Sequence, residues 1–177
     1  MIMFVSGGAR SGKSSYAESL CLQLAKKGTP LVYVATAQPL DSEMAERIER
    51  HRRQRSGRWQ TIEEAKEVDK VINLCQEGSI VLVDCLTIWL SHLLFEDVLS
   101  VEEILTAARR MLATAEKRQL SLVLVSNDVN EGVPPVDREV RRYIYALEQV
   151  HRLCVAEADQ AVQVIAGQGV MWKGDRA

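Results

Sequence analysis

The chain alternates between short apolar runs and longer segments in which apolar residues recur every three or four positions. The apolar runs cover residues 2–5, 31–35, 80–83, 122–125 and 161–166, with a shorter candidate at 59–62. Continuous apolar runs of this length are typical of buried parallel strands, because helices cover both faces of such a sheet. We therefore expect these six segments to be strands.

The segments between the runs have the spacing of amphipathic helices. Helices are expected at residues 14–27, 65–75, 86–95, 101–118 and 138–158, and a charged helix from about residue 39 to residue 55. Strands that alternate with helices predict an α/β fold, with a mostly parallel sheet and helices on both faces. Neither a linker nor a repeat divides the sequence, so we expect a single domain over residues 1–177.

Composition and charge argue against several classes of protein. The chain has 177 residues and a formal net charge of −2, which argues against a general nucleic-acid-binding protein. No apolar stretch reaches the ~18–20 residues of a membrane span. The four cysteines lack C-x-x-C spacing, which favours reduced thiols in a cytoplasmic protein over a zinc or redox site.

A glycine-rich stretch directly after the first expected strand carries the strongest chemical signal. It matches the G-x-x-x-x-G-K-S/T pattern of a phosphate-binding loop. Its residues are Gly7, Gly8, Ala9, Arg10, Ser11, Gly12, Lys13 and Ser14. Backbone N–H groups and the positive end of the following helix can surround a phosphate there. Lys13 is expected to bind the β- and γ-phosphates and Ser14 to bind Mg²⁺, while Arg10 either contacts phosphate or forms a surface salt bridge.

Asp84 ends the third long apolar run, where a second acidic ligand of the Mg²⁺ sphere is expected. The alternative is that Asp84 caps the helix that begins near Leu86. The carboxyl ends of parallel strands meet at one edge of a sheet, where ligands bind. Four residues that directly follow strands should line that edge together: Gly7, Thr36, Asp84 and Asn127.

His51 lies in the arginine-rich part of the expected charged helix, with Arg47 and Arg55 on the same helix face. Guanidinium groups suit a triphosphate and favour the neutral form of a neighbouring imidazole, which is the form that can attack phosphorus. The alternative is a solvated charged face without catalysis. The other two histidines, His92 and His151, are expected to be packing or surface residues.

Several stretches along nearly the whole chain match the pattern of one enzyme family. They are residues 5–14, 33–37, 41–48 leading into His51, Trp59 with Thr61, 82–87 and 123–129, followed by Gly132, Pro135, Arg138, Arg141 and Tyr143. On these residues the chain resembles the bifunctional adenosylcobinamide kinase/adenosylcobinamide-phosphate guanylyltransferases of cobalamin biosynthesis. The resemblance implies a RecA-like P-loop NTPase fold and a homotrimer.

The resemblance also implies two reactions. In the first, ATP or GTP phosphorylates the aminopropanol hydroxyl of adenosylcobinamide. In the second, GTP donates GMP to that phosphate through a GMP–histidine intermediate, giving adenosylcobinamide-GDP, and the matching histidine is His51. Beyond the phosphate loop, the implied nucleotide contacts are Thr36, Ala37, Gln38, Arg52, Arg53, Gln54, Arg55, Glu63 and Asp84.

The main alternative is a single-function P-loop kinase for a small metabolite, which has no use for a histidine nucleophile. A GTPase switch is disfavoured, because Asn127 is followed by Asp-Val-Asn rather than by Lys-x-Asp. Asp84 is likewise followed by Cys-Leu-Thr, whereas a switch protein carries Asp-x-x-Gly at that point.

Overall fold

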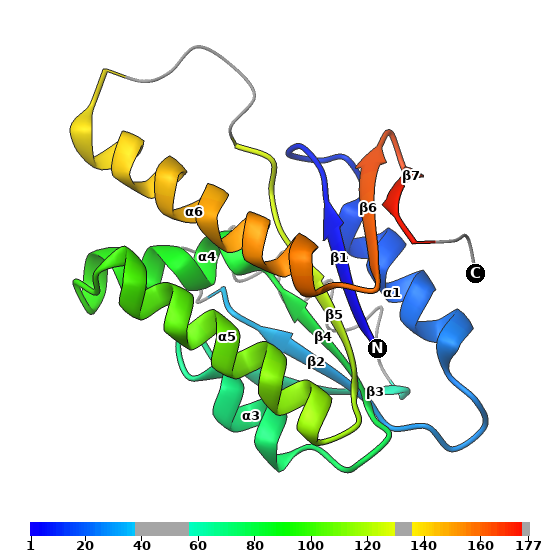
Figure 1. The fold of residues 1–177 in the computed structure, drawn as a ribbon. Coiled ribbons are helices and arrows are strands. Elements are labelled where there is room, and N and C mark those ends of the chain that lie inside the picture. The colour runs from blue at the N-terminus through cyan, green and yellow to red at the C-terminus, as the bar shows by residue number, and fades with distance from the viewer. Residues whose placement is uncertain (38–56, 130–135, 175–177) are drawn as a thin grey trace.

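The computed structural model of the chain describes residues 1–37, 57–129 and 136–174 (Figure 1). Its strands are β1 (Ile2–Ser6), β2 (Leu31–Ala35), β3 (Trp59–Glu63), β4 (Ile80–Asp84), β5 (Ser121–Val125), β6 (Gln160–Ile165) and β7 (Gln168–Lys173). Its helices are α1 (Lys13–Leu24), α3 (Val68–Leu74), α4 (Leu86–Ser91), the π-helix η1 (His92–Glu96), α5 (Val101–Lys117) and α6 (Arg138–Glu157). The charged helix expected at residues 39–55 lies outside the described residues.

All strands of the described residues belong to one sheet, in the order β3-β2-β4-β5-β1-β6-β7. Neighbouring strands are parallel except β6 and β7, which pair antiparallel. The prediction of a mostly parallel sheet is therefore confirmed. β5 lies between β4 and β1, so that Asp84 pairs with Val125, which in turn pairs with Val5.

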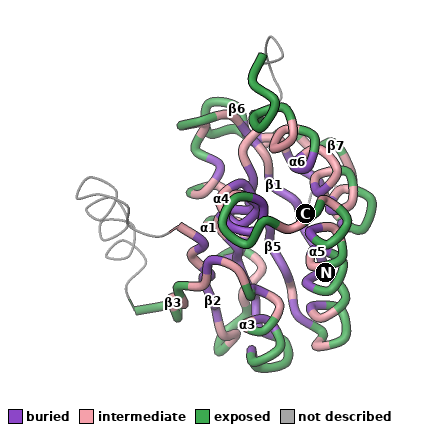
Figure 2. The backbone as a smooth tube through the Cα atoms, turned by 90° about the vertical axis from the view of Figure 1, so that its left-hand side faces the viewer, coloured by how far each residue is buried: buried purple, intermediate pink, exposed green. Residues whose placement is uncertain are grey.

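The continuous apolar runs are explained by two cores, one on each face of the sheet. Alternate residues of a strand point to opposite faces. Phe4 of β1 faces the core formed with α3, α4, α5 and α6, whereas Val5 faces the core formed with α1. Of the helices in the described residues, Figure 1 shows α1 on one side of the sheet and α3, α4, α5 and α6 on the other, and Figure 2 shows buried strands between more exposed helices.

The helix expected at residues 65–75 begins later, at Val68. The Glu64 side chain accepts hydrogen bonds from the backbone N–H groups of Lys66 and Glu67, both at 2.9 Å. This local side-chain bonding competes with the first helical turn and delays the helix.

The helix expected at residues 86–95 is divided into α4 and the π-helix η1. The Asp97 N–H donates to the His92 carbonyl, five residues back, at 3.1 Å. His92 itself is buried, with Nδ1 2.5 Å from Glu96 Oε1. An apolar periodicity predicts that a helix forms, and does not distinguish α-helical from π-helical hydrogen bonding.

The sequence pattern does not predict β7. Ala166 and Gly167 have φ values of 49° and 79° between the paired residues Ile165 and Gln168. Two positive φ values in a two-residue connection are typical of a type I′ hairpin turn. The turn carries alanine at its first position, where asparagine or aspartate is the usual signal. Without that signal, the sequence pattern indicates the end of a strand and not a hairpin turn.

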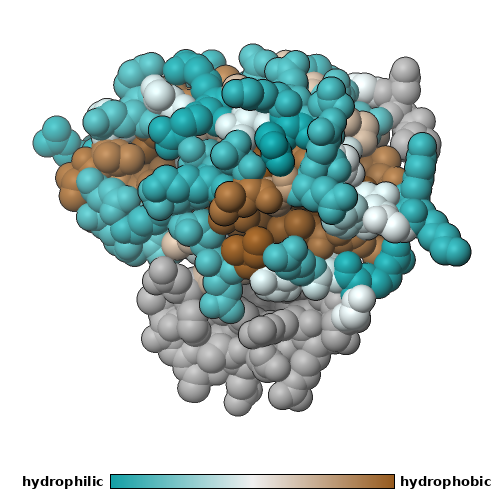
Figure 3. Space-filling model, turned by 90° about the horizontal axis from the view of Figure 1, so that it is seen from below, coloured by the Kyte–Doolittle hydropathy of each residue, from teal (hydrophilic) through white to brown (hydrophobic). Residues whose placement is uncertain are grey.

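Hydrophilic side chains cover much of the described surface in Figure 3, and apolar side chains gather near the middle and at the left of that face. Among the helices of the described residues, none combines the length and the apolar character needed to cross a membrane.

Candidate active site

The loop of residues 7–14 joins β1 to α1 and is held by backbone hydrogen bonds. The Ser11 N–H donates to the Gly8 carbonyl at 3.2 Å. The Gly167 N–H, from the β6–β7 turn, donates to the Ser11 carbonyl at 2.8 Å. The last hairpin of the sheet therefore supports the loop that the first strand introduces.

Two glycines of the loop are required by its geometry. A Cβ atom on Gly7 would lie 2.5 Å from Ser11 Oγ and 2.6 Å from the carbonyl oxygen of Val164, both within clashing range. Gly12 has a φ of 88°, a left-handed conformation that glycine adopts without strain. The loop closes this tightly only with glycine at these positions.

The N-terminus of α1 is arranged to receive an anion. Its cap residue Gly12 supplies no side-chain hydrogen bond, and the first turn holds no acidic residue. The first N–H groups of the helix and its positive dipole end are therefore left for a ligand. Lys13 begins this helix, is 8% exposed, and donates from Nζ to the Gly8 carbonyl at 3.1 Å. The lysine charge thus lies against the loop that would hold the phosphates.

The Ser11 hydroxyl is a buried polar group without a partner in the loop. Its Oγ atom is buried and has no hydrogen-bond partner within the described part of the chain. Leaving a buried polar atom unsatisfied costs about 1–3 kcal/mol. A phosphate oxygen held in the loop would supply the missing partner.

Asp84 ends β4, and its carboxylate does not cap the next helix. Cys85 is the cap residue of α4, and the cap makes no side-chain hydrogen bond. Instead, Asp84 Oδ2 accepts a hydrogen bond of 2.8 Å from the hydroxyl of Tyr33. The capping alternative is therefore excluded, and Tyr33 orients the carboxylate at the end of the strand.

The residues present fit a magnesium ion that arrives with a nucleotide. Across the described ranges, no group of three or more His, Cys, Asp or Glu side chains could hold a metal ion alone. The Ser14 hydroxyl and the Asp84 carboxylate are hard oxygen donors. Mg²⁺ is commonly bound by one or two protein groups of this kind, together with water and phosphate oxygens.

Hydrogen bonds between the strand ends confirm that the four predicted residues share one edge of the sheet. The Thr36 N–H donates to the Asp84 carbonyl at 3.1 Å, and the Asp128 N–H donates to the Gly7 carbonyl at 3.0 Å. Asn127 Nδ2 donates to Thr87 Oγ1 at 3.2 Å, across the gap between β5 and α4. The fully buried Thr36 hydroxyl bonds both the N–H and the carbonyl of Cys85.

Sequence reasoning missed the polar side chains beneath the loop. Asp128 Oδ2 accepts hydrogen bonds from Gln163 Nε2 at 3.1 Å and from Ser6 Oγ at 3.4 Å. Ser126 Oγ lies 2.7 Å from His151 Nε2. Burial lowers the pKa of His151 to about 4, with the nearby Asp128 carboxylate opposing that shift. Only the sheet order brings β5, β6 and α6 together here.

Part of the predicted site is not placed by the structure. His51, Gln38 and the segment from Arg52 to Arg55 lie outside the described residues. Glu63 is exposed at the end of β3 and pairs with Ala35 at the end of β2. The predicted nucleotide contacts of all these residues stay predictions.

The fold matches that of solved P-loop NTPases. The flagellar accessory protein FlaH of Methanocaldococcus jannaschii superposes with a TM-score of 0.54 at 12% sequence identity, over 98% of this chain and 78% of that chain. A KaiC-like protein of Pyrococcus horikoshii gives a TM-score of 0.55 at 12% identity, over 92% of this chain and 69% of that chain. At these identities the likeness concerns the fold alone, and it confirms the predicted P-loop NTPase fold.

Two curated relatives are similar over almost their whole length. The bifunctional adenosylcobalamin biosynthesis protein CobU of Escherichia coli strain K12 is 33% identical, covering 98% of this chain and 100% of that protein. The corresponding CobP of Pseudomonas aeruginosa is 35% identical, over 97% of this chain and 96% of that protein. The family model described as cobinamide kinase / cobinamide phosphate guanyltransferase matches residues 3–171. With its phosphate loop, its strand-end aspartate and this full-length similarity, the chain belongs to the cobinamide kinase / cobinamide phosphate guanyltransferase family.

Proposed function

We propose that this protein phosphorylates adenosylcobinamide with ATP or GTP and then transfers GMP from GTP to adenosylcobinamide phosphate, giving adenosylcobinamide-GDP. The observation that carries the proposal is the phosphate loop. It combines the helix N-terminus, the buried Lys13 and the unpartnered Ser11 hydroxyl in a chain of this family. Both reactions use a nucleoside triphosphate, so one loop can serve both.

The kinase step is a displacement at the γ-phosphorus. The substrate hydroxyl oxygen forms a bond to that phosphorus while the bond to the bridging oxygen of the β-phosphate breaks. Catalysis of this reaction consists mainly of positioning and of stabilising charge on the phosphate oxygens. The N–H groups of residues 7–14 and Lys13 supply both. Mg²⁺, when held by Ser14 and Asp84, would add neutralisation of the developing charge.

The guanylyl transfer takes place at the α-phosphorus instead. We assign His51 as the nucleophile: its neutral imidazole nitrogen bonds the α-phosphorus, and the bond to pyrophosphate breaks. A phosphate oxygen of adenosylcobinamide phosphate then attacks the same phosphorus, the P–N bond breaks and the imidazole is regenerated. Dividing the transfer in this way is covalent catalysis. The arginine-rich neighbours of His51 are suited to the charge of the departing pyrophosphate.

The single-function metabolite kinase is the alternative. It shares the phosphate loop and Asp84 but forms no covalent nucleotide adduct. The full-length similarity to proteins named as bifunctional favours two activities.

The homotrimer follows from the resemblance, whereas the single domain, the cytoplasmic location and the lack of nucleic-acid binding follow from the pattern, the cysteines and the charge of the sequence. We expect one domain over residues 1–177, acting as a homotrimer in the cytoplasm without binding nucleic acid. The single sheet that joins all described strands supports the one-domain organisation.

Turnover of adenosylcobinamide tests the role of the loop. With ATP, Mg²⁺ and adenosylcobinamide, chromatography should detect adenosylcobinamide phosphate, and addition of GTP should yield adenosylcobinamide-GDP. Lys13→Ala should lower the rate of phosphorylation by about 100-fold or more, because it removes a preorganised positive charge. Lys26→Ala, in the exposed turn after α1, serves as the matched control. Unchanged turnover by Lys13→Ala would remove the loop from the proposed function.

A further inference from the structure

The strand order places the end of β5 between the two parts of the proposed phosphate site. β1 leads into the phosphate loop, β4 ends at Asp84, and β5 is hydrogen-bonded between these two strands. A γ-phosphate that contacts both Lys13 and a Mg²⁺ ion held by Asp84 therefore lies over the end of β5. No residue at this strand end is among the predicted nucleotide contacts.

The backbone that follows β5 is fixed against the start of the loop. The Ser126 N–H donates to the Val5 carbonyl at 3.0 Å, and the Asp128 N–H donates to the Gly7 carbonyl at 3.0 Å. Asn127 lies between these two hydrogen bonds. Its position is therefore set by β1 and by the first residue of the loop.

Asn127 is the side chain at this strand end that suits a phosphate. Ser126 is fully buried, and its Oγ lies 2.7 Å from His151 Nε2. Asp128 Oδ2 already accepts two hydrogen bonds from other side chains, and a carboxylate repels a phosphate. Val129 is apolar and offers no side-chain hydrogen bond. The uncharged amide of Asn127 is a hydrogen-bond donor that carries no such repulsion.

The amide of Asn127 is held in place from one side. Nδ2 donates to Thr87 Oγ1 at 3.2 Å. Thr87 is buried, its hydroxyl lies 2.8 Å from Cys85 Sγ, and its carbonyl accepts a hydrogen bond of 3.0 Å from the Tyr143 hydroxyl. An amide nitrogen carries two N–H groups, and within the described residues the Asn127 side chain has no further hydrogen-bond partner. One N–H thus orients the half-buried amide, and the other is left for a ligand.

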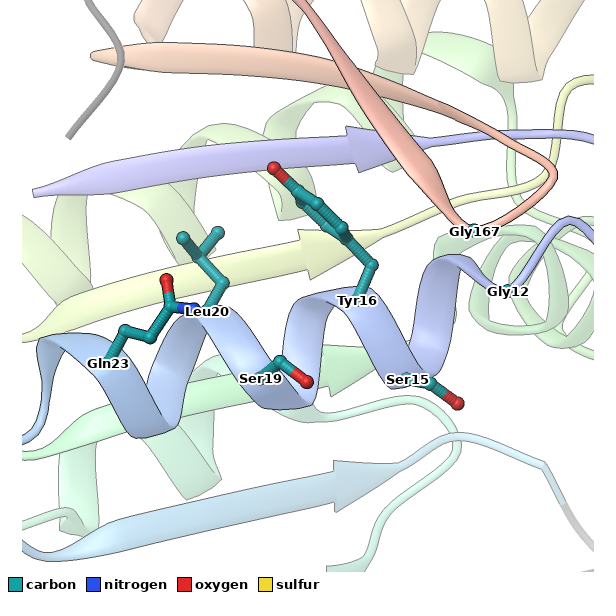
Figure 4. A pocket seen from close by; sticks show the side chains of 7 residues that line it. All are labelled: Gly12, Ser15, Tyr16, Ser19, Leu20, Gln23 and Gly167. Atoms are coloured by element: carbon teal, nitrogen blue, oxygen red, sulfur yellow. The ribbon is translucent and has the colours of Figure 1, made fainter.

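The pocket of about 430 Å³ beside α1 lies away from this point (Figure 4). It is lined by α1 and by Gly167 of the β6–β7 turn, and by no residue that follows β2, β4 or β5. The pocket therefore does not supply the contacts of a γ-phosphate that lies over the strand ends. Those contacts have to come from the strand ends themselves.

We propose that Asn127 is a catalytic residue of the kinase step, in which its side-chain amide donates a hydrogen bond to an oxygen of the γ-phosphate. The inference rests on the proposed function, because it concerns the same nucleotide. The contact makes and breaks no covalent bond, and the displacement at the γ-phosphorus keeps its attacking and leaving oxygens. A donor fixed at the γ-phosphate oxygens stabilises the charge that they carry in the transition state.

A comparison of ATP with ADP isolates this contact, because the two differ by the γ-phosphate. Calorimetric titration with Mg²⁺ measures both dissociation constants for the wild type and for Asn127→Asp, which replaces the donor with a carboxylate that repels phosphate oxygens. Asn73→Asp makes the same change at an exposed position of α3 and serves as the matched control.

We expect Asn127→Asp to raise the Kd of ATP by about tenfold or more, which corresponds to at least about 1.4 kcal/mol. The Kd of ADP should rise by less than about threefold, and binding of ADP with the stoichiometry of the wild type shows that the variant is folded. Asn73→Asp should leave both constants unchanged. An equal rise for ATP and ADP in Asn127→Asp, or no rise in either, overturns the inference.

Steady-state kinetics test the catalytic part of the inference. Asn127→Ala should lower kcat for phosphorylation of adenosylcobinamide by about 100-fold, with little change in the KM for adenosylcobinamide, because a donor to the transition state is lost. Turnover by Asn127→Ala at the kcat of the wild type overturns the inference and leaves the proposed function in place. Wild-type protein that binds ATP but forms no adenosylcobinamide phosphate contradicts the proposed function, and the comparison of ATP with ADP still decides whether Asn127 contacts the γ-phosphate.

Discussion

At the scale of single residues, the arrangement around Asp84 shows what a side chain at a strand end can do. Tyr33 donates a hydrogen bond to one carboxylate oxygen, and Thr36 joins the ends of β2 and β4 by bonding the backbone of Cys85. The Tyr33 hydrogen bond fixes the direction in which the carboxylate points, and the Thr36 bonds hold the backbone that follows Asp84. A group oriented before the ligand arrives spends less free energy on ordering when the cation and nucleotide bind.

Replacing Asp84 tests this reading. Asp84→Asn should lower kcat/KM for phosphorylation of adenosylcobinamide by about 100-fold, since it removes the charge proposed to meet Mg²⁺. Tyr33→Phe keeps the carboxylate and removes only the orienting hydrogen bond, so it should cost less than about tenfold. Steady-state kinetics over a range of Mg²⁺ concentrations measure both effects. Equal rates for Asp84→Asn and the wild type would assign the aspartate a purely structural role.

At the scale of elements, the turn between β6 and β7 connects parts of the molecule that are distant in sequence. It donates a hydrogen bond to the phosphate loop through Gly167, and the end of β6 approaches Gly7 through Val164. The conformation of the loop therefore depends on the last hairpin of the sheet. A substitution in either the loop or the hairpin should therefore change the conformation or stability of the other.

Substitutions at the two adjacent glycines Gly7 and Gly8 test the contact between the loop and β6. Gly7→Ala should lower the free energy of unfolding by about 1–3 kcal/mol, because its Cβ would meet the immobile Val164 carbonyl. Gly8→Ala has no atom within 4 Å of the added Cβ and should change stability by less than about 0.5 kcal/mol. Urea unfolding followed by circular dichroism measures both. Similar stabilities for the two variants would contradict the packing of the loop against β6.

The strands and helices also show which parts of the fold could be predicted from the sequence. The five apolar runs became β1, β2, β4, β5 and β6. Burial inside a mostly parallel sheet leaves a continuous apolar signal that can be recognised without knowing which strands are neighbours. The hairpin partner β7 was missed because its turn relies on alanine at a positive φ. The residues beneath the loop, such as Asp128 and His151, come together only through strand order. No local pattern encodes that order.

At the scale of the whole molecule, His151 couples the long helix α6 to the centre of the sheet. Its ring packs edge-on against Phe4 with centroids 5.1 Å apart, and its Nε2 lies 2.7 Å from Ser126 Oγ. The burial that lowers its pKa to about 4 makes the neutral ring part of the folded state. In the unfolded chain the same ring has an ordinary pKa of about 6.5.

Stability should therefore depend on pH through this histidine. Below about pH 6.5 the unfolded chain takes up a proton that the folded protein does not, so stability falls as the pH drops toward 4. The slope from this single group reaches about 1.4 kcal/mol per pH unit. Urea unfolding of the wild type and of His151→Gln at pH 7 and pH 5 isolates the contribution. His151→Gln should lose less stability between the two pH values than the wild type does, and an equal loss would contradict the buried neutral ring.

The central claim is that this chain carries GMP covalently on His51 in addition to acting as a kinase. Incubating the protein with α-labelled GTP and Mg²⁺, followed by denaturation, tests it most directly. The account predicts label that remains on the denatured protein, is released by acid, and is absent from His51→Ala. The control His92→Asn, at the buried histidine of η1, should keep the label. Wild-type protein without retained label, or His51→Ala with full label, would contradict the account.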